Sequence, residues 1–385
     1  MLVQEKESDD YTVSGPETKR AYLTARIRAN FDHLPLYLYP RRNVSLFSSS
    51  ILPDGLKGKI EVIAPDVVHM HWVTYGFLRP QTLTTIKRPI VWTLHDMWPF
   101  TGGCHYSQGC ERYVTDCGCC PLLSSSSPHD LSWWNWQWKA ESWRGLPLTI
   151  VSPSRWLADC AKRSQLFKDA NIEVIPNGID LTHFSPRDKA LCRDILSLPQ
   201  GKKIILTGGI DYKSDGRKGF DLLLPAVRQL KEVVPNAALA VVGMTRPETI
   251  PDFGLPVYYL GRLNDEISLG IAYGAADLFV APSRKENLSN MVLEAISCGI
   301  PCVAYAIGGM PDLIENGSNG FLSPPFDTTD LAAGMIKILN DDSLRHVMGK
   351  YSRQKEEHGF AMDLVAGRYS RLYEKAICMY KARVS

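Results

Sequence analysis

Short apolar runs alternate with helical patterns in two successive series, and this alternation restricts the fold of the chain more than any other feature. The first series contains the runs VVHMHW (67–72), PIVWTL (89–94), LTIVS (148–152) and IEVI (172–175). The second contains KIILTG, ALAVVG, VYYLG, DLFVA and PCVAY, separated by helical patterns such as 220–234 and 265–275. Such alternation is typical of parallel sheets with crossover helices. Because the turn Pro176-Asn177-Gly178 divides the series, we predict an α/β protein of two Rossmann-like domains.

The composition excludes several classes of protein. Of the 385 residues, 45% are hydrophobic and 22% are charged, and the net charge is +2, as in ordinary globular domains. This balance predicts no nucleic-acid partner. No apolar run approaches the roughly 18 residues that span a bilayer, and the opening MLVQEKESDD lacks the basic and apolar regions of a signal peptide. We therefore expect a cytoplasmic protein.

The cysteines are too scattered to indicate a disulfide framework. Five of the ten lie in helical or strand patterns, where cysteine behaves as a small hydrophobic residue. We interpret these five as packing residues: Cys160, Cys192, Cys298, Cys302 and Cys378.

Two carboxylates flank a predicted strand-to-helix turn within residues 282–311. The run 276–282 is apolar and closed by proline, so it reads as a buried parallel strand. Turn and N-cap residues follow, and then an apolar helical run, which places Glu286 in the turn and Glu294 about one turn into the helix. A helix N-terminus at this edge of a sheet suits a diphosphate, whereas carboxylates suit sugar and ribose hydroxyls. We predict that Glu286 and Glu294 bind a nucleotide sugar.

These residues match the E-x7-E signature of family 4 retaining glycosyltransferases, which the chain resembles from His69 to its C-terminal helix. Other matching motifs are VVHMHW, VWTLHDMWPFTGGCHY, VIPNGID, GRKGFDLLL and GGMPDLI. The resemblance implies the GT-B fold, in which two Rossmann-like domains face a cleft and a C-terminal helix crosses back to the first. It also implies a bacterial enzyme of exopolysaccharide or lipopolysaccharide assembly. Such an enzyme moves a sugar from a nucleotide sugar to a saccharide or lipid-linked saccharide acceptor and retains the anomeric configuration.

The resemblance also sets the expected domain limits. We place an acceptor-binding domain at 1–177, a nucleotide-sugar-binding domain at 178–361 and the returning helix at 362–385. The family implies an opening strand, a glycine-rich turn and a long helix, and nothing before Thr18 supplies them. Residues 1–4 then correspond to the second strand of the domain. We expect either a start codon placed late or a natural truncation.

Two cations follow the first strand of the second series. Gly208-Gly209 ends that strand, and a polar loop leads to Arg217 and Lys218 at the start of the next helix. Cations there are well placed for a diphosphate, arginine as a fork and lysine as a point charge. The resemblance implies an arginine after the first glycine and a lysine further on. Lys218 matches the lysine, but Ile210 holds the arginine position, so Arg217 is a candidate substitute.

Three further segments complete the expected donor site, which also includes Gly209. Asn287 and Leu288 continue the turn after Glu286. Gly308-Gly309 follows the strand CVAY, and the absence of a Cβ would let the backbone approach the donor closely. Arg262-Leu263 lies in a segment that resembles the one whose backbone meets the nucleotide base.

His95 closes the strand PIVWTL at its carboxyl end, where the resemblance implies contact with the transferred sugar. A satisfied core histidine is the alternative. His69 and His71 lie in an alternating strand and read as packing residues. The resemblance implies an oxocarbenium-like transition state and no protein nucleophile, so Lys218, Glu286 and His95 would carry the catalytic work. Because the chain has no Asp-x-Asp motif, we expect no catalytic metal.

A cysteine cluster comes shortly after His95, within TGGCHYSQGCERYVTDCGCCP. Thiols this close together in a cytosolic chain suggest a structural zinc site, and disulfides or free thiols are the alternatives. The candidate ligands are Cys104, Cys110, Cys117 and Cys120, with Cys119 and His105 alongside.

A tryptophan-rich helical pattern and the overall function each leave an alternative open. Aromatic and basic residues together can dock on a membrane surface, although an interdomain core with snorkelling cations is commoner. The residues concerned are Trp133, Trp134, Trp136, Trp138, Lys139, Trp143 and Arg144. For the function, the alternatives to a transferase are an epimerase or a phosphorylase of the same fold and a truncated, non-catalytic paralogue that binds nucleotide sugar or a partner. A phosphorylase would need a pyridoxal lysine or a phosphate site, and the sequence shows neither.

Overall fold

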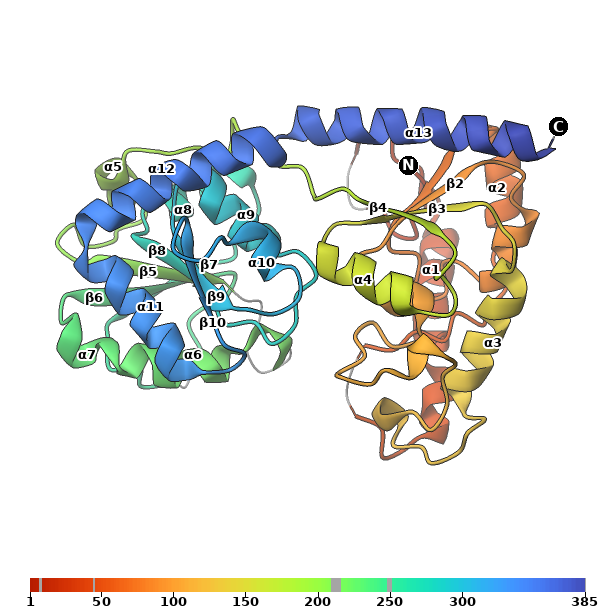
Figure 1. Cartoon of the computed structure of the whole chain (residues 1–385), viewed down its shortest axis with the longest axis horizontal. Coiled ribbons are helices and arrows are strands. Elements are labelled where there is room, and N and C mark those ends of the chain that lie inside the picture. Colours follow the sequence, from red (N-terminus) through yellow and green to blue (C-terminus); the bar gives the residue numbers. More distant parts are fainter. Residues whose placement is uncertain (7–8, 44–45, 209–215, 248–250, 385) are drawn as a thin grey trace. The chain divides into compact units, whose positions relative to one another are not determined.

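The chain divides into two compact α/β units, each built around a parallel sheet (Figure 1). The computed structural model describes every residue except 7–8, 44–45, 209–215, 248–250 and 385. Unit 1 contains Met1–Pro153, Leu157–Val174 and Arg371–Ser385. Unit 2 contains Ser154–Trp156 and Ile175–Ser370. The predicted pair of α/β domains is confirmed.

The described sheet of unit 1 has four parallel strands in the order β1-β2-β3-β4. Three strands fall within predicted apolar runs, and the fourth overlaps one: β1 (Val68–Met70), β2 (Ile90–Thr93), β3 (Leu148–Ser152) and β4 (Asn171–Val174). Every residue of β2 and β3 is buried, which explains why these two strands read as continuous apolar runs. The helices that begin in this part of the chain are α1 (Lys19–Phe31), α2 (Leu56–Ile63), α3 (Leu131–Trp143) and α4 (Arg155–Arg163).

Residues 1–4 do not form a strand of this sheet, so that prediction is wrong. Leu2 makes only an isolated bridge with Ser14, and the Val3 N–H donates to the Ser14 carbonyl at 2.9 Å. Met1 and Val3 therefore make backbone hydrogen bonds to Ser14 and not to a strand of the sheet. It lines one side of a hollow of about 940 Å³ that β1 also borders.

The described sheet of unit 2 has six parallel strands in the order β10-β9-β8-β5-β6-β7. Five of them match predicted runs: β5 (Lys203–Gly208), β6 (Ala237–Val242), β7 (Val257–Gly261), β8 (Leu278–Ala281) and β9 (Cys302–Tyr305). The sequence analysis missed β10 (Gly320–Ser323), because its sequence GFLS has only two apolar side chains between glycine and serine and so forms no apolar run. The chain order reverses at β5, which lies between β6 and β8.

Helices cover both faces of the sheet in unit 2. Ile204 and Leu206 of β5 belong to one buried cluster, and Ile205 between them belongs to a second cluster. Successive side chains of a strand point to opposite faces, so each cluster is the core of one face. Residues of α8 (Glu266–Gly274) and α9 (Asn290–Ser297) enter the first cluster, and residues of α6 (Phe220–Arg228), α7 (Leu230–Val233) and α11 (Thr328–Asn340) enter the second. The helix predicted over 220–234 is divided at Gln229 into α6 and α7.

The last helix belongs to both units. The remaining helices are α5 (Lys189–Ile195), α10 (Met310–Leu313), α12 (Asp342–Gly359) and α13 (Met362–Val384). From Arg371 onward, α13 is part of unit 1, where the Tyr373 hydroxyl lies 2.7 Å from His69 Nδ1. Lys375 also forms a 2.7 Å ion pair with Glu173 in that unit. Across the described ranges, no helix combines the length and apolar character needed to cross a membrane.

Candidate functional site

The predicted donor residues of unit 2 lie along one edge of its sheet. Neighbouring strands β5, β8 and β9 end at Gly208, Ala281 and Tyr305, and the candidate segments follow these three ends. In open parallel sheets, ligand sites form outside the carboxyl ends of the strands where the order reverses. The order reverses at β5, so the sheet topology selects the edge that the motifs predicted.

Lys218 and Glu286 form an ion pair in this part of unit 2. The Lys218 Nζ lies 2.9 Å from Glu286 Oε2, and the two side chains are 36% and 15% exposed. The backbone beside Lys218 lies against the end of the β8 segment, and only glycine fits at position 219. A Cβ on Gly219 would lie 2.0 Å from the Pro282 carbonyl oxygen, and its φ of +63° favours glycine. Two residues 68 positions apart are thus joined, and both were predicted from their motifs.

Arg217 contributes to the site through its backbone. Its carbonyl accepts a hydrogen bond from the Arg284 N–H at 2.7 Å, which ties the segment before α6 to the segment after β8. Gly209, the remaining donor candidate of this loop, lies outside the described residues.

Glu294 stands inside α9, as predicted, with a partner that the sequence analysis missed. The Ser289 hydroxyl caps α9 by accepting from the Val292 N–H. The Tyr273 hydroxyl, on α8, donates to Glu294 at 2.7 Å. Burial raises the pKa of Glu294 from 4.5 to about 7, and the Tyr273 hydrogen bond opposes this rise. A buried tyrosine within a helical apolar pattern carries no sequence signal for such a contact.

Gly308 and Gly309 pack against the turn that carries Glu286. A Cβ on Gly308 would lie 1.8 Å from the Glu286 carbonyl oxygen, and a Cβ on Gly309 would lie 1.8 Å from that of Asn287. The Gly309 N–H also donates to the Glu286 carbonyl at 3.3 Å. These glycines therefore allow a close contact with the backbone of residues 286–287, whereas the sequence analysis predicted a close approach to the donor. The pair holds the Glu286 turn in place.

The other donor candidates differ in what they offer a ligand. Asn287 is buried, and its Oδ1 accepts from the Ser154 hydroxyl at 2.7 Å. Leu288 is part of the core, so only its backbone remains for binding. After β7, Arg262 is exposed, whereas Leu263 packs against the core.

In unit 1, His95 follows β2 and contacts His71. His95 Nε2 lies 2.9 Å from His71 Nδ1, and both residues are exposed. The interpretation of His71 as a packing residue is therefore wrong. Both rings keep access to solvent, but the protein atoms around them desolvate the charged form and lower the pKa of both imidazoles, that of His71 to about 4. At neutral pH one neutral ring therefore donates to the other. His69 instead lies between Thr93 and Tyr373, 2.8 and 2.7 Å away, and is a structural residue.

Asp96 anchors the segment that follows His95. Its carboxylate accepts from Trp72 Nε1 at 2.8 Å and lies 2.6 Å from His105 Nδ1. His105 Nε2 lies 2.9 Å from the Ser48 hydroxyl. The order serine, histidine, aspartate is that of a hydrolytic triad, but all three residues are buried, so no ester or amide substrate reaches the hydroxyl. The network fixes the backbone beside His95.

The tryptophan-rich pattern forms α3, most of which packs inside unit 1. Trp136 and Trp143 are buried, whereas Trp134 is 50% exposed. Lys139 does not snorkel, which corrects that expectation. Its side chain is buried, and its Nζ lies 3.7 Å from the centre of the Trp98 ring.

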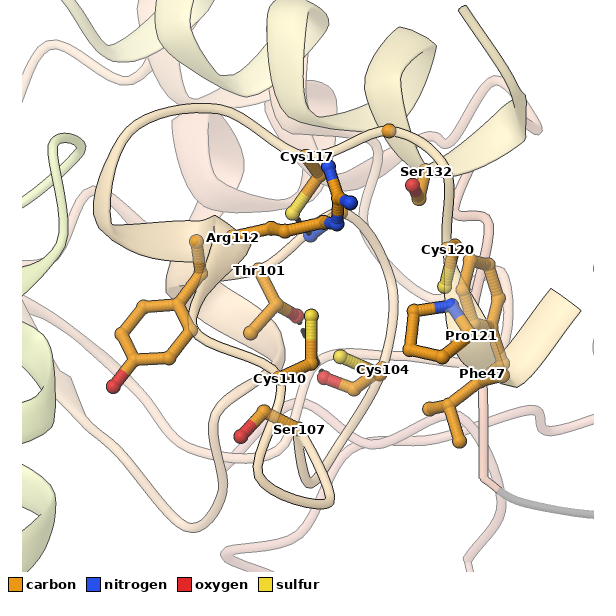
Figure 2. A pocket seen from close by; sticks show the side chains of 14 residues that line it. Phe47, Thr101, Cys104, Ser107, Cys110, Arg112, Cys117, Cys120, Pro121 and Ser132 are labelled. Atoms are coloured by element: carbon orange, nitrogen blue, oxygen red, sulfur yellow. Dashed lines mark hydrogen bonds between the residues drawn. The ribbon is translucent and has the colours of Figure 1, made fainter. Parts of the chain in front are cut away.

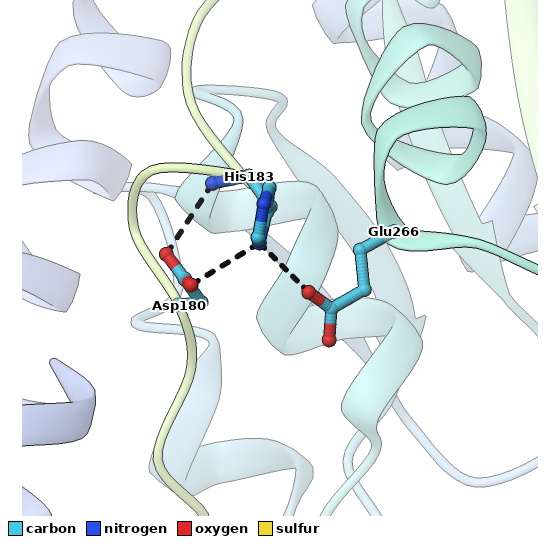
Figure 3. A group of neighbouring side chains, drawn as sticks. All are labelled: Asp180, His183 and Glu266. Atoms are coloured by element: carbon cyan, nitrogen blue, oxygen red, sulfur yellow. Dashed lines mark hydrogen bonds and ion pairs between the residues drawn. The ribbon is translucent and has the colours of Figure 1, made fainter. Parts of the chain in front are cut away.

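One group of ionisable side chains in unit 2 has the spacing of metal ligands. Among the described residues, Asp180, His183 and Glu266 place ligand atoms within 4.8 Å of one another. Figure 3 shows His183 between the two carboxylates, with its Nδ1 2.9 Å from Glu266 and 3.1 Å from Asp180. These side chains are at least 38% exposed, and the contacts are those of surface ion pairs. The group carries no assignment of a metal.

Two family models match consecutive parts of the chain. Residues 7–183 match the model described as Glycosyltransferase Family 4, and residues 188–355 match that of Glycosyl transferases group 1. The boundary between the two matches falls within residues 184–187.

Known proteins resemble the chain in sequence and in fold. D-inositol 3-phosphate glycosyltransferase of Corynebacterium jeikeium is 32% identical over 53% of the chain and 52% of its own length. The putative colanic acid biosynthesis glycosyl transferase WcaC of Escherichia coli is 30% identical over 56% of the chain and 51% of its own length. The chain thus spans about half the length of these curated relatives. The structure of Anabaena HepE in complex with UDP is similar in fold, with a TM-score of 0.60 and 18% identity over 83% of the chain and 82% of that protein.

Proposed function

We propose that the chain transfers a sugar from a nucleotide-sugar donor to a saccharide acceptor, because its two parts match the models of Glycosyltransferase Family 4 and of Glycosyl transferases group 1 and its fold resembles that of HepE. The observation that carries this proposal is the arrangement in unit 2. The Lys218–Glu286 pair, Glu294 and the start of α9 lie at the sheet edge where the strand order reverses. A lysine and a helix N-terminus suit a diphosphate, and the carboxylates suit hydroxyl groups. HepE, which shares the fold, binds UDP.

The proposed transfer proceeds with retention, as the E-x7-E resemblance implies, and without a protein nucleophile or a catalytic metal. The acceptor attacks the face of the sugar that the diphosphate leaves. Lys218 stabilises the negative charge that builds on the departing diphosphate. In the free protein Glu286 holds this ammonium at 2.9 Å, so Lys218 is oriented before the donor binds.

The role of Lys218 is tested by turnover. Removal of one such stabilising group costs several kcal/mol, so we expect Lys218→Ala to lower turnover by about a hundredfold or more. Lys350→Ala is the matched control, because Lys350 is exposed on α12. Wild-type turnover in Lys218→Ala would exclude the electrostatic role.

We propose that His95 donates a hydrogen bond to a hydroxyl of the transferred sugar. Its neutral imidazole and the neighbouring His71 support a donor of fixed orientation. We expect His95→Ala to lower turnover while the affinity for the nucleotide alone stays unchanged. An equal loss of nucleotide affinity would assign His95 to another role.

The acceptor is proposed to be a saccharide or lipid-linked saccharide of the cell surface that binds to unit 1. The role of WcaC in colanic acid biosynthesis supports this assignment. Peripheral contact with a membrane is supported by α1 rather than by α3. Leu23, Ile27 and Phe31 share one face of α1 and are 58%, 44% and 50% exposed, with exposed cations nearby at Lys19, Arg20 and Arg26.

Vesicle flotation tests the membrane contact. We expect the protein to float with vesicles that contain acidic phospholipid and to float less after Ile27→Glu. Trp134→Glu is the matched control on α3, because Trp134 is also 50% exposed. Equal flotation of wild type and Ile27→Glu would exclude α1 as the contact.

The transferase itself is tested by binding and turnover together. In a thermal-shift panel of UDP, GDP, ADP and CMP, saturating ligand at about 100 times its dissociation constant adds roughly 2.7 kcal/mol of stability. We expect one nucleotide to raise the melting temperature and Glu294→Ala to abolish the rise. Hydrolysis of the matching nucleotide sugar would then exclude a non-catalytic binding protein. Binding without any donor turnover would favour the non-catalytic alternative.

A further inference from the structure

Four cysteines face one small cavity in unit 1. The loop after β2 folds around a space of about 20 Å³ whose lining includes Cys104, Cys110, Cys117 and Cys120. In Figure 2 the sulfur atoms of these residues point into the same space from different sides. A space of roughly 10 to 15 Å³ already holds one water-sized particle, so the cavity has room for a single ion. All four cysteines are free thiols in the structure, and no three of their sulfur atoms lie within 4.8 Å of one another, so the thiols have to move closer together to bind one metal ion.

The loop excludes the two other candidate ligands of this segment. The Cys119 thiol points to the Ser126 carbonyl, 3.4 Å away, and Cys119 does not line the cavity. Both ring nitrogens of His105 are engaged, one with Asp96 at 2.6 Å and the other with Ser48 at 2.9 Å. Six possible ligands in the sequence are thus reduced to four thiols by the fold.

Two glycines fix the backbone around Cys117. Gly118, between them, has a φ of +141°, and a Cβ there would lie 2.2 Å from the Pro128 carbonyl oxygen. Only glycine fits this tight turn. The Gly102 N–H donates to Cys117 Sγ at 3.2 Å. Amide hydrogen bonds of this kind support the charge on a metal-bound thiolate.

A buried lysine beneath the loop is an independent observation. The Lys139 side chain is 1% exposed, and its Nζ donates to the carbonyls of Trp98 and Thr101 at 2.5 and 2.9 Å. Thr101 also lines the thiol cavity. Burial lowers the pKa of Lys139 to about 7, and negative charge on Cys117 and Cys104 would raise it. A divalent zinc ion with four thiolates has a net charge of −2, which would favour the ammonium form of this lysine.

We propose that Cys104, Cys110, Cys117 and Cys120 bind one structural zinc ion. Four Zn–S bonds form as the four thiol protons pass to solvent, and no oxidation state changes. Because four protein ligands fill the tetrahedral shell, the ion has no open position for substrate. Binding draws the sulfur atoms to about 2.3 Å from the metal and pins the loop that begins just beyond His95 and Asp96.

Metal analysis of the full chain, purified without a metal-binding tag under reducing conditions, tests this site. We expect about one equivalent of zinc per chain, and intense visible absorption of tetrahedral cobalt thiolate after replacement of zinc by Co²⁺. Cys117→Ser and Cys120→Ser should each lose the zinc. Cys119→Ser is the matched control and should keep it, because its thiol lies outside the cavity.

If a variant does not fold, the zinc content and the cobalt spectrum of the wild-type protein still decide the question. Under half an equivalent of zinc after incubation with the metal, or a cobalt complex without thiolate absorption, would overturn the proposal. Unchanged zinc in folded Cys117→Ser would also overturn it. Loss of zinc from Cys119→Ser with retention in Cys120→Ser would assign the ligands differently and contradict the structure. The outcome is independent of the proposed transferase activity, which requires no metal.

Discussion

Glu294 makes nucleotide affinity depend on pH if its carboxylate binds the ribose. Burial raises its pKa to about 7, so about a tenth of the molecules carry the carboxylate at pH 6 and about nine tenths at pH 8. Only the ionised form accepts hydrogen bonds with both oxygens. Affinity should therefore strengthen with rising pH, by up to about tenfold or ~1.4 kcal/mol between these values.

Two variants separate the contribution of Glu294 from other titrations. Glu294→Gln is neutral at every pH and should remove the dependence. Tyr273→Phe removes the hydroxyl that donates to Glu294 at 2.7 Å and lowers its pKa. The pKa of Glu294 should then rise, and the change in affinity should move to higher pH.

Isothermal titration calorimetry with the nucleotide found in the thermal-shift panel gives the measurement, at constant ionic strength. The terminal phosphate of a nucleoside diphosphate titrates near pH 6 as well, by analogy with a phosphorylated side chain of pKa about 6. This titration is common to wild type and Glu294→Gln, so their affinity ratio isolates the carboxylate. A ratio that does not change between about pH 6 and 8 would refute the role of Glu294 in binding.

Three further predictions concern stability and the shape of the site. Burial raises the pKa of Glu356 from 4.5 to about 8, so its contribution to stability is present at low pH and is lost as pH rises through about 8; Glu356→Gln should raise the melting temperature at about pH 9 and change it little at about pH 5. Asp277 binds buried Arg193 at 2.7 Å, and Asp277→Ala should lower the unfolding free energy in urea by about 3 to 5 kcal/mol, whereas an effect below about 1 kcal/mol would contradict a buried pair. Gly309→Ala should displace the Glu286 turn and weaken nucleotide binding in calorimetry, because its Cβ would lie 1.8 Å from the Asn287 carbonyl oxygen, whereas Gly359→Ala, with nothing within 4 Å, should not.

Local patterns were sufficient for the framework of the donor site. The apolar run before Pro282 predicted β8, and Ser289 followed by apolar spacing predicted α9, so Glu286 and Glu294 were placed correctly on the turn and the helix. Backbone structure of this kind depends on residues close together in the chain. The sequence signal and the physical cause lie in the same short segment.

Contacts between distant residues were not predictable in this way. Tyr273 reaches Glu294 from another helix, and the burial of Lys139 depends on the fold of the loop above it. The alternating pattern of the strand predicted a packing role for His71. That pattern contains no information on which side chain lies opposite, and in the structure it is His95. The orientation that separates Cys119 from Cys120 also depends on a loop without periodicity.

The route of α13 has a consequence for biosynthesis. Unit 1 includes both the first residues of the chain and those from Arg371 onward, and His69 finds one of its two partners in Tyr373. Residues 175–370 are therefore synthesised before the residues from Arg371 onward that belong to unit 1. Unit 1 cannot form the contact between His69 and Tyr373 until the ribosome has made all of unit 2.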